Sequence, residues 1–319
     1  MRKRWVLAAV LAAAAAAAPA APETRAAKPT APVRAFAGIL PVAGFVERIG
    51  GARVQVGVLI GSGQSPHTFE PTPRAMADLA DAAVYFSADL PFEERLLAKI
   101  TAVNPALKIV HTRAGVALRR MTDDETEAEE HAHHGEAARE EGHGAHGRAA
   151  GEPDPHFWLA PRSAKVLAAH VAEGLAAVDP AGAAAYRDRL RAVQDDLDRL
   201  DADLRQTLAP LKGQAFFVFH PAFGYFGDAY GLRQVSVEIE GKEPGARQLT
   251  DLIGEARRLG VRVVFVQPQF SKKSAEAVAR AIGGAVVEMD PLARDYAANL
   301  RDMAEKVRQA LRPPQAEPP

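Results

Sequence analysis

The side chains best suited to chemistry in this 319-residue chain are its ten histidines, since the chain contains no cysteine. Imidazole is the commonest metal ligand among side chains. An acidic stretch from Thr122 to Asp154 contains five of the histidines: His131, His133, His134, His143 and His146. This stretch lacks the apolar residues that packing requires, so the sequence predicts a mobile loop that collects metal ions. A solvated charged insertion with incidental histidines is the alternative interpretation.

Four further candidate metal ligands stand beside apolar runs elsewhere in the chain. His67 lies shortly after one apolar run, and His156 stands where the histidine-rich stretch ends. His220 and Asp290 each follow an apolar run directly. Open α/β sheets bind ligands outside the carboxyl ends of their strands, where we expect His220 and Asp290, with His67 as a further candidate. All four residues stand at the edges of apolar runs in both halves of the chain, which makes them candidates for one site. Three imidazoles and one carboxylate suit tetrahedral Zn²⁺, whereas Mn²⁺ favours more oxygen ligands.

Other interpretations of these residues remain open. A single histidine beside a proline is more often structural than a ligand, and we expect structural roles for His111 and His170. Glu288 is the substitute for Asp290 as a carboxylate ligand. A zinc-dependent hydrolase would need a general base, for which Glu288 or Glu243 is available. Metallohydrolases often place two ligands a helical turn apart, but the candidates here are separated by more than sixty residues each. This spacing favours a metal held between two halves of the chain.

The elements that must position these residues alternate along the chain. Short β-rich apolar runs separate amphipathic stretches, which indicates an α/β fold with mostly parallel sheets. The predicted strands cover residues 54–60, 83–86, 108–110, 216–219, 235–239, 261–266 and 285–289. The predicted helices between them include residues 73–79, 249–259 and 275–282.

One segment departs from this alternation. Asp179 and Pro180 form a good helix start, with a carboxylate cap followed by proline at the first helical position. Apolar residues then recur every three or four positions: Tyr186, Leu190, Val193, Leu197, Leu200, Leu204 and Leu208. The pattern predicts one helix over residues 179–209, about 45 Å long. We expect it to join two (β/α) lobes, residues 33–178 and 210–311, with residues 122–153 as the loop within the first lobe. A surface helix of a single domain is the alternative.

The two ends of the chain have their own signals. Basic residues from Arg2 to Arg4 precede an apolar stretch from Trp5 to Ala18 and then small residues, so we expect residues 1–26 to be a cleavable signal peptide and leader. The apolar stretch is shorter than the ~20 residues that span a bilayer. Without a cysteine near this exit for a lipid anchor, the expected location is the periplasm. The Pro-rich residues 312–319 are expected to be disordered.

The composition also limits the partners of the protein. A net charge of −1, from 39 basic and 40 acidic residues, gives no basic field that would attract nucleic acid. The absence of cysteine excludes disulfides and thiolate ligands, so any metal site must use nitrogen and oxygen.

Five motifs, taken in order, resemble a known family. They are Ser65-Pro66-His67-Thr68-Phe69-Glu70-Pro71, Asp154-Pro155-His156-Phe157-Trp158-Leu159, Phe219-His220-Pro221-Ala222-Phe223-Gly224-Tyr225-Phe226, Glu240-Gly241-Lys242-Glu243-Pro244 and Met289-Asp290-Pro291-Leu292. Together they resemble the periplasmic zinc-binding proteins of ABC importers, the ZnuA-like branch of the metal-binding solute receptors. The resemblance extends from about Val33 to Leu311.

This resemblance implies a zinc ion between two lobes, with His67, His156 and His220 as ligands and Asp290 or a water at the fourth position. Manganese-binding relatives have a carboxylate in place of His220, so the resemblance implies zinc rather than manganese or another divalent metal. It also implies delivery to the membrane permease of an ABC importer by a monomeric receptor that is not an enzyme, with the loop histidines as accessory zinc ligands. The chain departs from some relatives in having Pro66 where they have glutamate, and in having no disulfide.

Overall fold

Two four-stranded sheets, each made only of parallel strands, form the framework of the protein. They lie in the part of the chain that the computed structural model describes, residues 31–122, 151–238, 246–270 and 272–311. In the first sheet the order is β2-β1-β3-β4, with bounds Val54–Ile60, Val33–Ile39, Val84–Ser87 and Lys108–His111. The helices that follow its strands are α1 (Leu40–Gly50), α2 (Pro73–Ala80) and α3 (Pro91–Val103). Parallel pairing requires such crossovers, because the chain must return to the same end of the sheet before each new strand begins.

The second sheet repeats this design. Its order is β6-β5-β7-β8, with bounds Arg233–Ser236, Ala215–Val218, Val263–Val266 and Ala285–Glu288. The intervening helices are α7 (Gly224–Tyr230), α8 (Ala246–Arg258) and α9 (Lys272–Ile282). A short 3₁₀ turn, η2 (Phe157–Leu159), precedes the helix α5 (Pro161–Val178) that connects the first sheet to the long helix. The predicted α/β fold with parallel sheets is confirmed.

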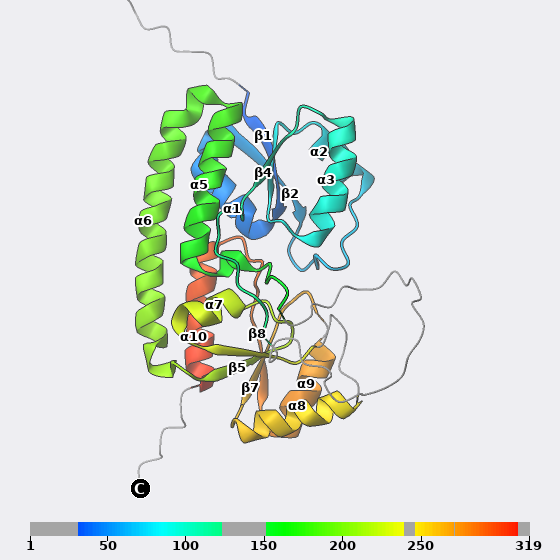
Figure 1. Ribbon diagram of the computed structural model, residues 1–319, viewed down its shortest axis with the longest axis vertical. Coiled ribbons are helices and arrows are strands. Elements are labelled where there is room, and N and C mark those ends of the chain that lie inside the picture. Colours follow the sequence, from blue (N-terminus) through cyan, green and yellow to red (C-terminus); the bar gives the residue numbers. More distant parts are fainter. Residues whose placement is uncertain (1–30, 123–150, 239–245, 271, 312–319) are drawn as a thin grey trace, which may run out of the picture. The chain divides into compact units, whose positions relative to one another are not determined.

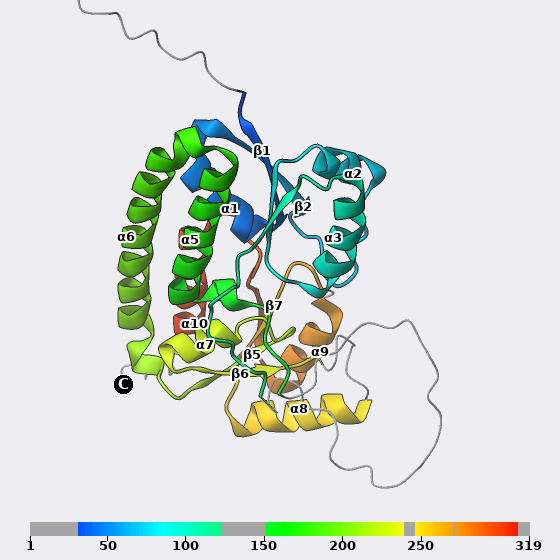
Figure 2. The same ribbon diagram turned by 45° about the horizontal axis from the view of Figure 1, so that its top comes forward.

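The long helix is α6 (Ala183–Leu208), flanked by the 3₁₀ turns η3 (Pro180–Gly182) and η4 (Ala209–Leu211). It packs along α5 and against α1 and α10 (Tyr296–Leu311), as both views of the ribbon show (Figure 1, Figure 2). The predicted apolar stripe makes these contacts: Tyr186, Val193, Leu197, Leu200, Leu204 and Leu208 are buried. One continuous hydrophobic core therefore includes residues from both halves of the chain.

The predicted cap of the long helix is not formed. Asp179 stands at the N-cap position of η3 without a side-chain capping hydrogen bond. Its carboxylate instead accepts two hydrogen bonds from Arg53, at 2.7 and 2.8 Å, and one at 2.6 Å from the hydroxyl of Tyr186 in the first turn of α6. The charged partner Arg53 offers stronger hydrogen bonds than backbone N–H groups would. Through Arg53, Asp179 therefore connects the start of the helical segment to the first lobe.

Several predictions concern residues outside the described part of the chain. They are the signal peptide and leader in residues 1–26, most of the predicted loop at 122–153, and the tail at 312–319. Among the described residues, no helix combines the length and apolar character that crossing a membrane requires.

Candidate metal centre

Three imidazoles from distant segments lie together in the structure. His67 belongs to the connection between β2 and α2, His156 immediately precedes η2, and His220 follows β5. The Nε2 atoms of His67 and His220 are 3.3 Å apart, and their ring centres are 4.8 Å apart. The ring centre of His156 lies 5.4 Å from that of His220. The three histidines proposed from the sequence are thus neighbours in the fold.

These spacings resemble those of ligands around a tetrahedral cation. With zinc–nitrogen bonds of about 2.0–2.1 Å, two ligand nitrogens lie about 3.3 Å apart and their ring centres about 5 Å apart. Among the described residues, no three His, Asp or Glu side chains lie close enough together to hold one metal ion as they stand. The pair His67–His220 has the spacing of two zinc ligands, and the ring of His156 lies beside that of His220.

His220 is held through both its backbone and its ring. The side chain of Gln267, a buried residue just after β7, accepts a hydrogen bond from the His220 N–H at 3.1 Å and donates one to the His220 carbonyl at 2.5 Å. The ring atom Nδ1 lies 2.8 Å from Oε1 of the buried Glu238. A carboxylate at Nδ1 favours the tautomer with its proton there, so Nε2 presents a lone pair to the site.

His156 has the same arrangement on a different carboxylate. Its Nδ1 lies 2.8 Å from Oδ1 of Asp154, which also accepts the His156 N–H at 2.9 Å. Asp154 is fully buried, and Arg119 donates to its other oxygen at 3.2 Å. Burial by itself would raise the pKa of this carboxyl, but the hydrogen bonds from His156 and the charge of Arg119 outweigh it and lower the pKa. Asp154 is therefore an anion behind His156.

Aromatic rings restrict the imidazoles from their sides. Phe270, which follows β7, stacks on His220 with ring centres 4.9 Å apart and planes inclined by 26°. The same ring lies 6.2 Å from the ring centre of His67. Trp158 packs edge-on against His156, with ring centres 5.5 Å apart. These contacts pack aromatic rings against all three imidazoles.

Asp290 follows β8, but its side-chain contacts are those of a structural carboxylate. Its Oδ1 accepts hydrogen bonds from Gln269 at 2.8 Å and from the Leu292 N–H at 2.9 Å. Glu288, the alternative carboxylate, forms an ion pair with Lys272 at 3.1 Å and is half exposed. The structure therefore brings neither carboxylate into a described contact with the three imidazoles.

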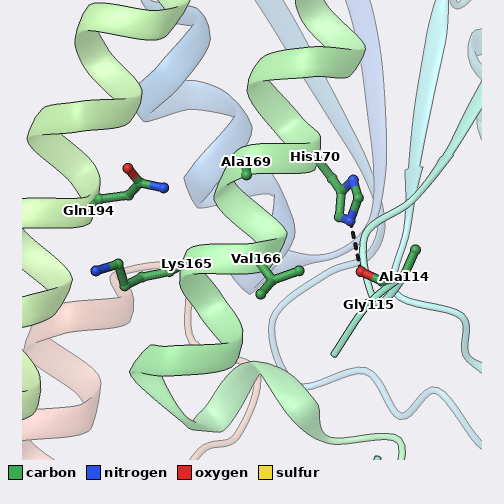
Figure 3. Close-up of a pocket in the computed structure, with 7 residues that line it drawn as sticks. All are labelled: Ala114, Gly115, Lys165, Val166, Ala169, His170 and Gln194. Atoms are coloured by element: carbon green, nitrogen blue, oxygen red, sulfur yellow. Dashed lines mark hydrogen bonds between the residues drawn. The ribbon is translucent and has the colours of Figure 1, made fainter. Parts of the chain in front are cut away.

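Two other described histidines have partners elsewhere. His111, at the end of β4, contacts Asp89 through Nδ1 at 2.5 Å. His170 on α5 contacts the Ala114 carbonyl at 2.8 Å, within a shallow groove that Lys165 and Gln194 also line (Figure 3). Both contacts agree with the structural roles expected of these residues. The loop histidines His131, His133, His134, His143 and His146 lie outside the described residues.

The residues that hold the ligands in place were missed in the sequence. Glu238 stands inside the apolar run predicted as a strand, and an acidic residue in such a run was the available signal. Arg119, Gln267 and Phe270 carry no local signal, because their roles depend on which distant histidine each one meets.

The family of the chain is shown by comparison with known proteins. A family profile described as "ZnuA: Zinc-uptake complex component A periplasmic" matches residues 36–310. The high-affinity zinc uptake system protein ZnuA of Brucella abortus (strain 2308) is 33% identical over 171 residues, which are 50% of this chain and 51% of the relative. The zinc-binding protein AdcA of Streptococcus pyogenes serotype M3 (strain ATCC BAA-595 / MGAS315) is 26% identical over 269 residues, 82% of this chain and 50% of the relative. The chain spans about half the length of these curated relatives.

Solved structures agree over more of the fold. A crystal structure of ZnuA is similar with a TM-score of 0.77 and 35% identity, covering 88% of this chain and 100% of its own. A ZnuA deletion mutant with zinc bound has a TM-score of 0.77 and 36% identity, covering 90% of this chain and 100% of its own. Because the family profile extends from β1 into α10, the chain belongs to the ZnuA family, the periplasmic component A of zinc-uptake complexes.

Proposed function

We propose that this protein is a periplasmic zinc receptor, which binds one Zn²⁺ between His67, His156 and His220 and delivers it to the membrane permease of an ABC importer. The observation that carries the proposal is the 3.3 Å separation of the His67 and His220 Nε2 atoms, with His156 beside them. Membership in the ZnuA family supports it, as do relatives named for zinc uptake and zinc binding.

The charge of the surroundings suits a divalent cation. Three neutral imidazoles bring no charge to the site, but the buried carboxylates of Asp154 and Glu238 stand directly behind two of them. Their two negative charges offset the charge of Zn²⁺ without occupying its coordination positions. Carboxylates in this position also make the ligating nitrogen more basic.

The ligand types favour zinc over manganese. Nitrogen ligands suit Zn²⁺, whereas Mn²⁺ prefers carboxylate, carbonyl and water oxygen. For the fourth position we propose Asp290, with a water as the alternative. Asp290 would have to exchange its hydrogen bond with Gln269 for the metal.

The proposal includes parts of the chain that the structure does not describe. We propose that residues 1–26 direct export as a cleavable signal and leader, and that the five loop histidines add weaker zinc sites. The lobes would be residues 33–178 and 210–311, with α6 between them, and the receptor would act as a monomer. Mobile ligands bind more weakly because binding must order them.

A metal titration of the chelator-stripped protein tests this function. Zn²⁺ and Mn²⁺ are each titrated in competition with a chromogenic chelator, into the intact chain and into a variant that lacks residues 123–150. The deletion leaves the base of the loop intact. There the Met121 N–H donates to the Glu152 carbonyl and the Gly151 N–H donates to the Met121 carbonyl, both at 2.9 Å. We expect one tight zinc site in both proteins and much weaker Mn²⁺ binding. Loss of the tight site with the loop would show a zinc buffer instead of a receptor.

A further inference from the structure

Arg119 lies where the segments that carry two of the proposed ligands meet. Its side chain is 10% exposed, and it donates through Nη1 to Asp154 at 3.2 Å and through Nε to Asp228 on α7 at 2.9 Å. Its backbone N–H donates to the hydroxyl of Tyr225, also on α7, at 2.9 Å. One residue of the first half of the chain is thus hydrogen-bonded to α7 at two points, Asp228 and Tyr225, and to Asp154 at a third point outside that helix.

Each end of this contact leads to a proposed zinc ligand. Asp154 is hydrogen-bonded to the ring and the backbone N–H of His156. The helix α7 begins at Gly224, four residues after His220. Arg119 therefore connects the carboxylate that orients one ligand to the helix that follows the other.

Gly224 shows how closely these parts fit. A Cβ at this position would lie 2.3 Å from Arg119 Nη1 and 2.7 Å from Asp154 Oδ2. A Cβ fits in that space only if the guanidinium or the carboxylate shifts, so the glycine permits both groups to lie against the start of α7. The close approach of Arg119 and Asp154 to α7 therefore depends on the absence of a side chain at residue 224.

We propose that Arg119 is a positioning residue for zinc binding. It fixes Asp154 so that His156 presents Nε2 to the metal. Arg119 can hold Asp154 in this way only while α7 packs beside it. This inference rests on the proposed function, since it assumes that His156 binds zinc. Arg119 itself does not touch the metal. Its planar guanidinium suits the role, because it can bind two carboxylates in fixed directions at once, which a lysine ammonium cannot do equally well.

Substitutions at Arg119 test the proposal directly. Arg119→Met removes the charge and both hydrogen bonds, and we expect the zinc Kd to rise about 10–100-fold, the usual effect of losing a residue behind a ligand. Arg119→Lys keeps the charge beside Asp154 but not the two fixed hydrogen bonds, and we expect it to recover part of the affinity. Arg301→Met is the matched control, because Arg301 also pairs with an aspartate, Asp203 at 3.0 Å, but on an exposed surface between α10 and α6.

Gly224→Ala gives an independent test that leaves Arg119 in place. The added Cβ displaces the guanidinium from Asp154, so the zinc Kd is expected to rise as in Arg119→Met. Gly254→Ala on α8 is its control, because a Cβ there meets nothing within 4 Å.

The readouts separate positioning from simple support of the fold. For each variant the zinc Kd, the thermal midpoint of the metal-free protein and the absorption spectrum of the Co²⁺-loaded protein are measured, since that spectrum responds to the ligands and their geometry. Altered cobalt spectra in Arg119→Met and Gly224→Ala, with partial recovery in Arg119→Lys, support the proposal. Wild-type zinc affinity in folded Arg119→Met or Gly224→Ala overturns it. Equal losses in Arg119→Met and Arg119→Lys, with an unchanged cobalt spectrum, also overturn it.

Failure of the proposed function has a different signature. In that case the wild-type protein shows no tight zinc site that depends on His156, and the Arg119 variants have nothing to alter. A tight wild-type site that is lost in His156→Ala but is unaffected in Arg119→Met rejects only the positioning role.

Discussion

The Nε2 atoms of His67 and His220 lie 3.3 Å apart, and 153 residues separate the two histidines along the chain. Two imidazole lone pairs facing each other at this distance repel, unless a proton or a cation lies between them. Glu238 holds the Nδ1 side of His220, which favours a lone pair on the nitrogen that faces His67. The arrangement is therefore one that a cation stabilises, and several consequences can be measured.

Replacing the carboxylate behind His220 should weaken zinc binding without removing a ligand. Glu238→Gln offers an amide that can also donate to Nδ1, which would move the ring proton to Nε2 and block it as a ligand. We expect one zinc per chain, with a Kd raised about 10–100-fold in a competition titration. Glu288→Gln is the control, since that carboxylate is half exposed and pairs with Lys272. Equal affinities for the two variants would contradict the role of Glu238.

The stacking ring on His220 should slow the release of zinc. Phe270→Ala removes the contact with His220, whose ring centre is 4.9 Å away. An aromatic pair contributes about 0.5–1.5 kcal/mol, so the dissociation rate should rise about two- to tenfold when zinc is released into excess chelator. Phe270→Tyr keeps the ring and should release zinc at the wild-type rate. An alanine variant as slow as the tyrosine variant would show that the stacking has no effect on release.

A buried carboxyl in the first lobe should make folding stability depend on pH. Glu93 on α3 is 1% exposed and accepts hydrogen bonds from the Tyr85 hydroxyl at 2.7 Å and the Leu90 N–H at 2.8 Å. Burial raises its pKa more than these hydrogen bonds lower it, from 4.5 to about 7. Between these values the folded protein binds more protons than the unfolded chain, so stability falls as pH rises from 4.5 to about 7 and is constant above.

The size of this effect is about 3 kcal/mol, since each unit of pKa shift corresponds to about 1.4 kcal/mol. Glu93→Gln does not titrate, so the decline in unfolding free energy between pH 5 and pH 7 should be smaller in that variant. Urea unfolding at several pH values measures the slope, with exposed Glu94→Gln as the control. A slope in Glu93→Gln equal to that of the wild type would exclude Glu93 as its source.

The apolar stripe of α6 should carry much of the stability of the core. Leu200 is fully buried in the core shared by both halves of the chain. Leu200→Ala removes buried methyl groups and leaves a cavity, which typically costs about 2–5 kcal/mol. Chemical denaturation gives the change in unfolding free energy, and the exposed neighbour Arg199→Ala should change it by less than about 0.5 kcal/mol. Similar losses for the two variants would show that the stripe is not the packed face.

The sequence predicted elements where the local pattern was strong. Six of the seven residues in the predicted stripe of the long helix are buried, because a period of three to four directly encodes one packed face. Each of the seven predicted strands overlaps one of β2 to β8, although the prediction for β6, residues 235–239, shares only Val235 and Ser236 with the observed strand Arg233–Ser236. These features depend on neighbours along the chain, which a single sequence displays.

The first strand was missed for a physical reason. β1 lies in the middle of the first sheet but contains Ala35, Ala37 and Gly38, which have weak strand preference. A Cβ on Gly38 would lie 2.1 Å from Glu93 Oε1, so the small residue is required by a partner more than fifty positions away. Such a requirement cannot be seen until the sheet is assembled. The same holds for Arg119, whose partners Asp154 and Asp228 are distant in sequence.

The most direct test of the account is zinc binding by His220→Ala, measured by competition titration in the variant that lacks residues 123–150. His111→Ala in the same background is the control, because His111 contacts Asp89 rather than the other imidazoles. We predict that His220→Ala weakens the single tight site at least about 100-fold while His111→Ala leaves it unchanged. A tight zinc site that survives in His220→Ala would contradict the central claim.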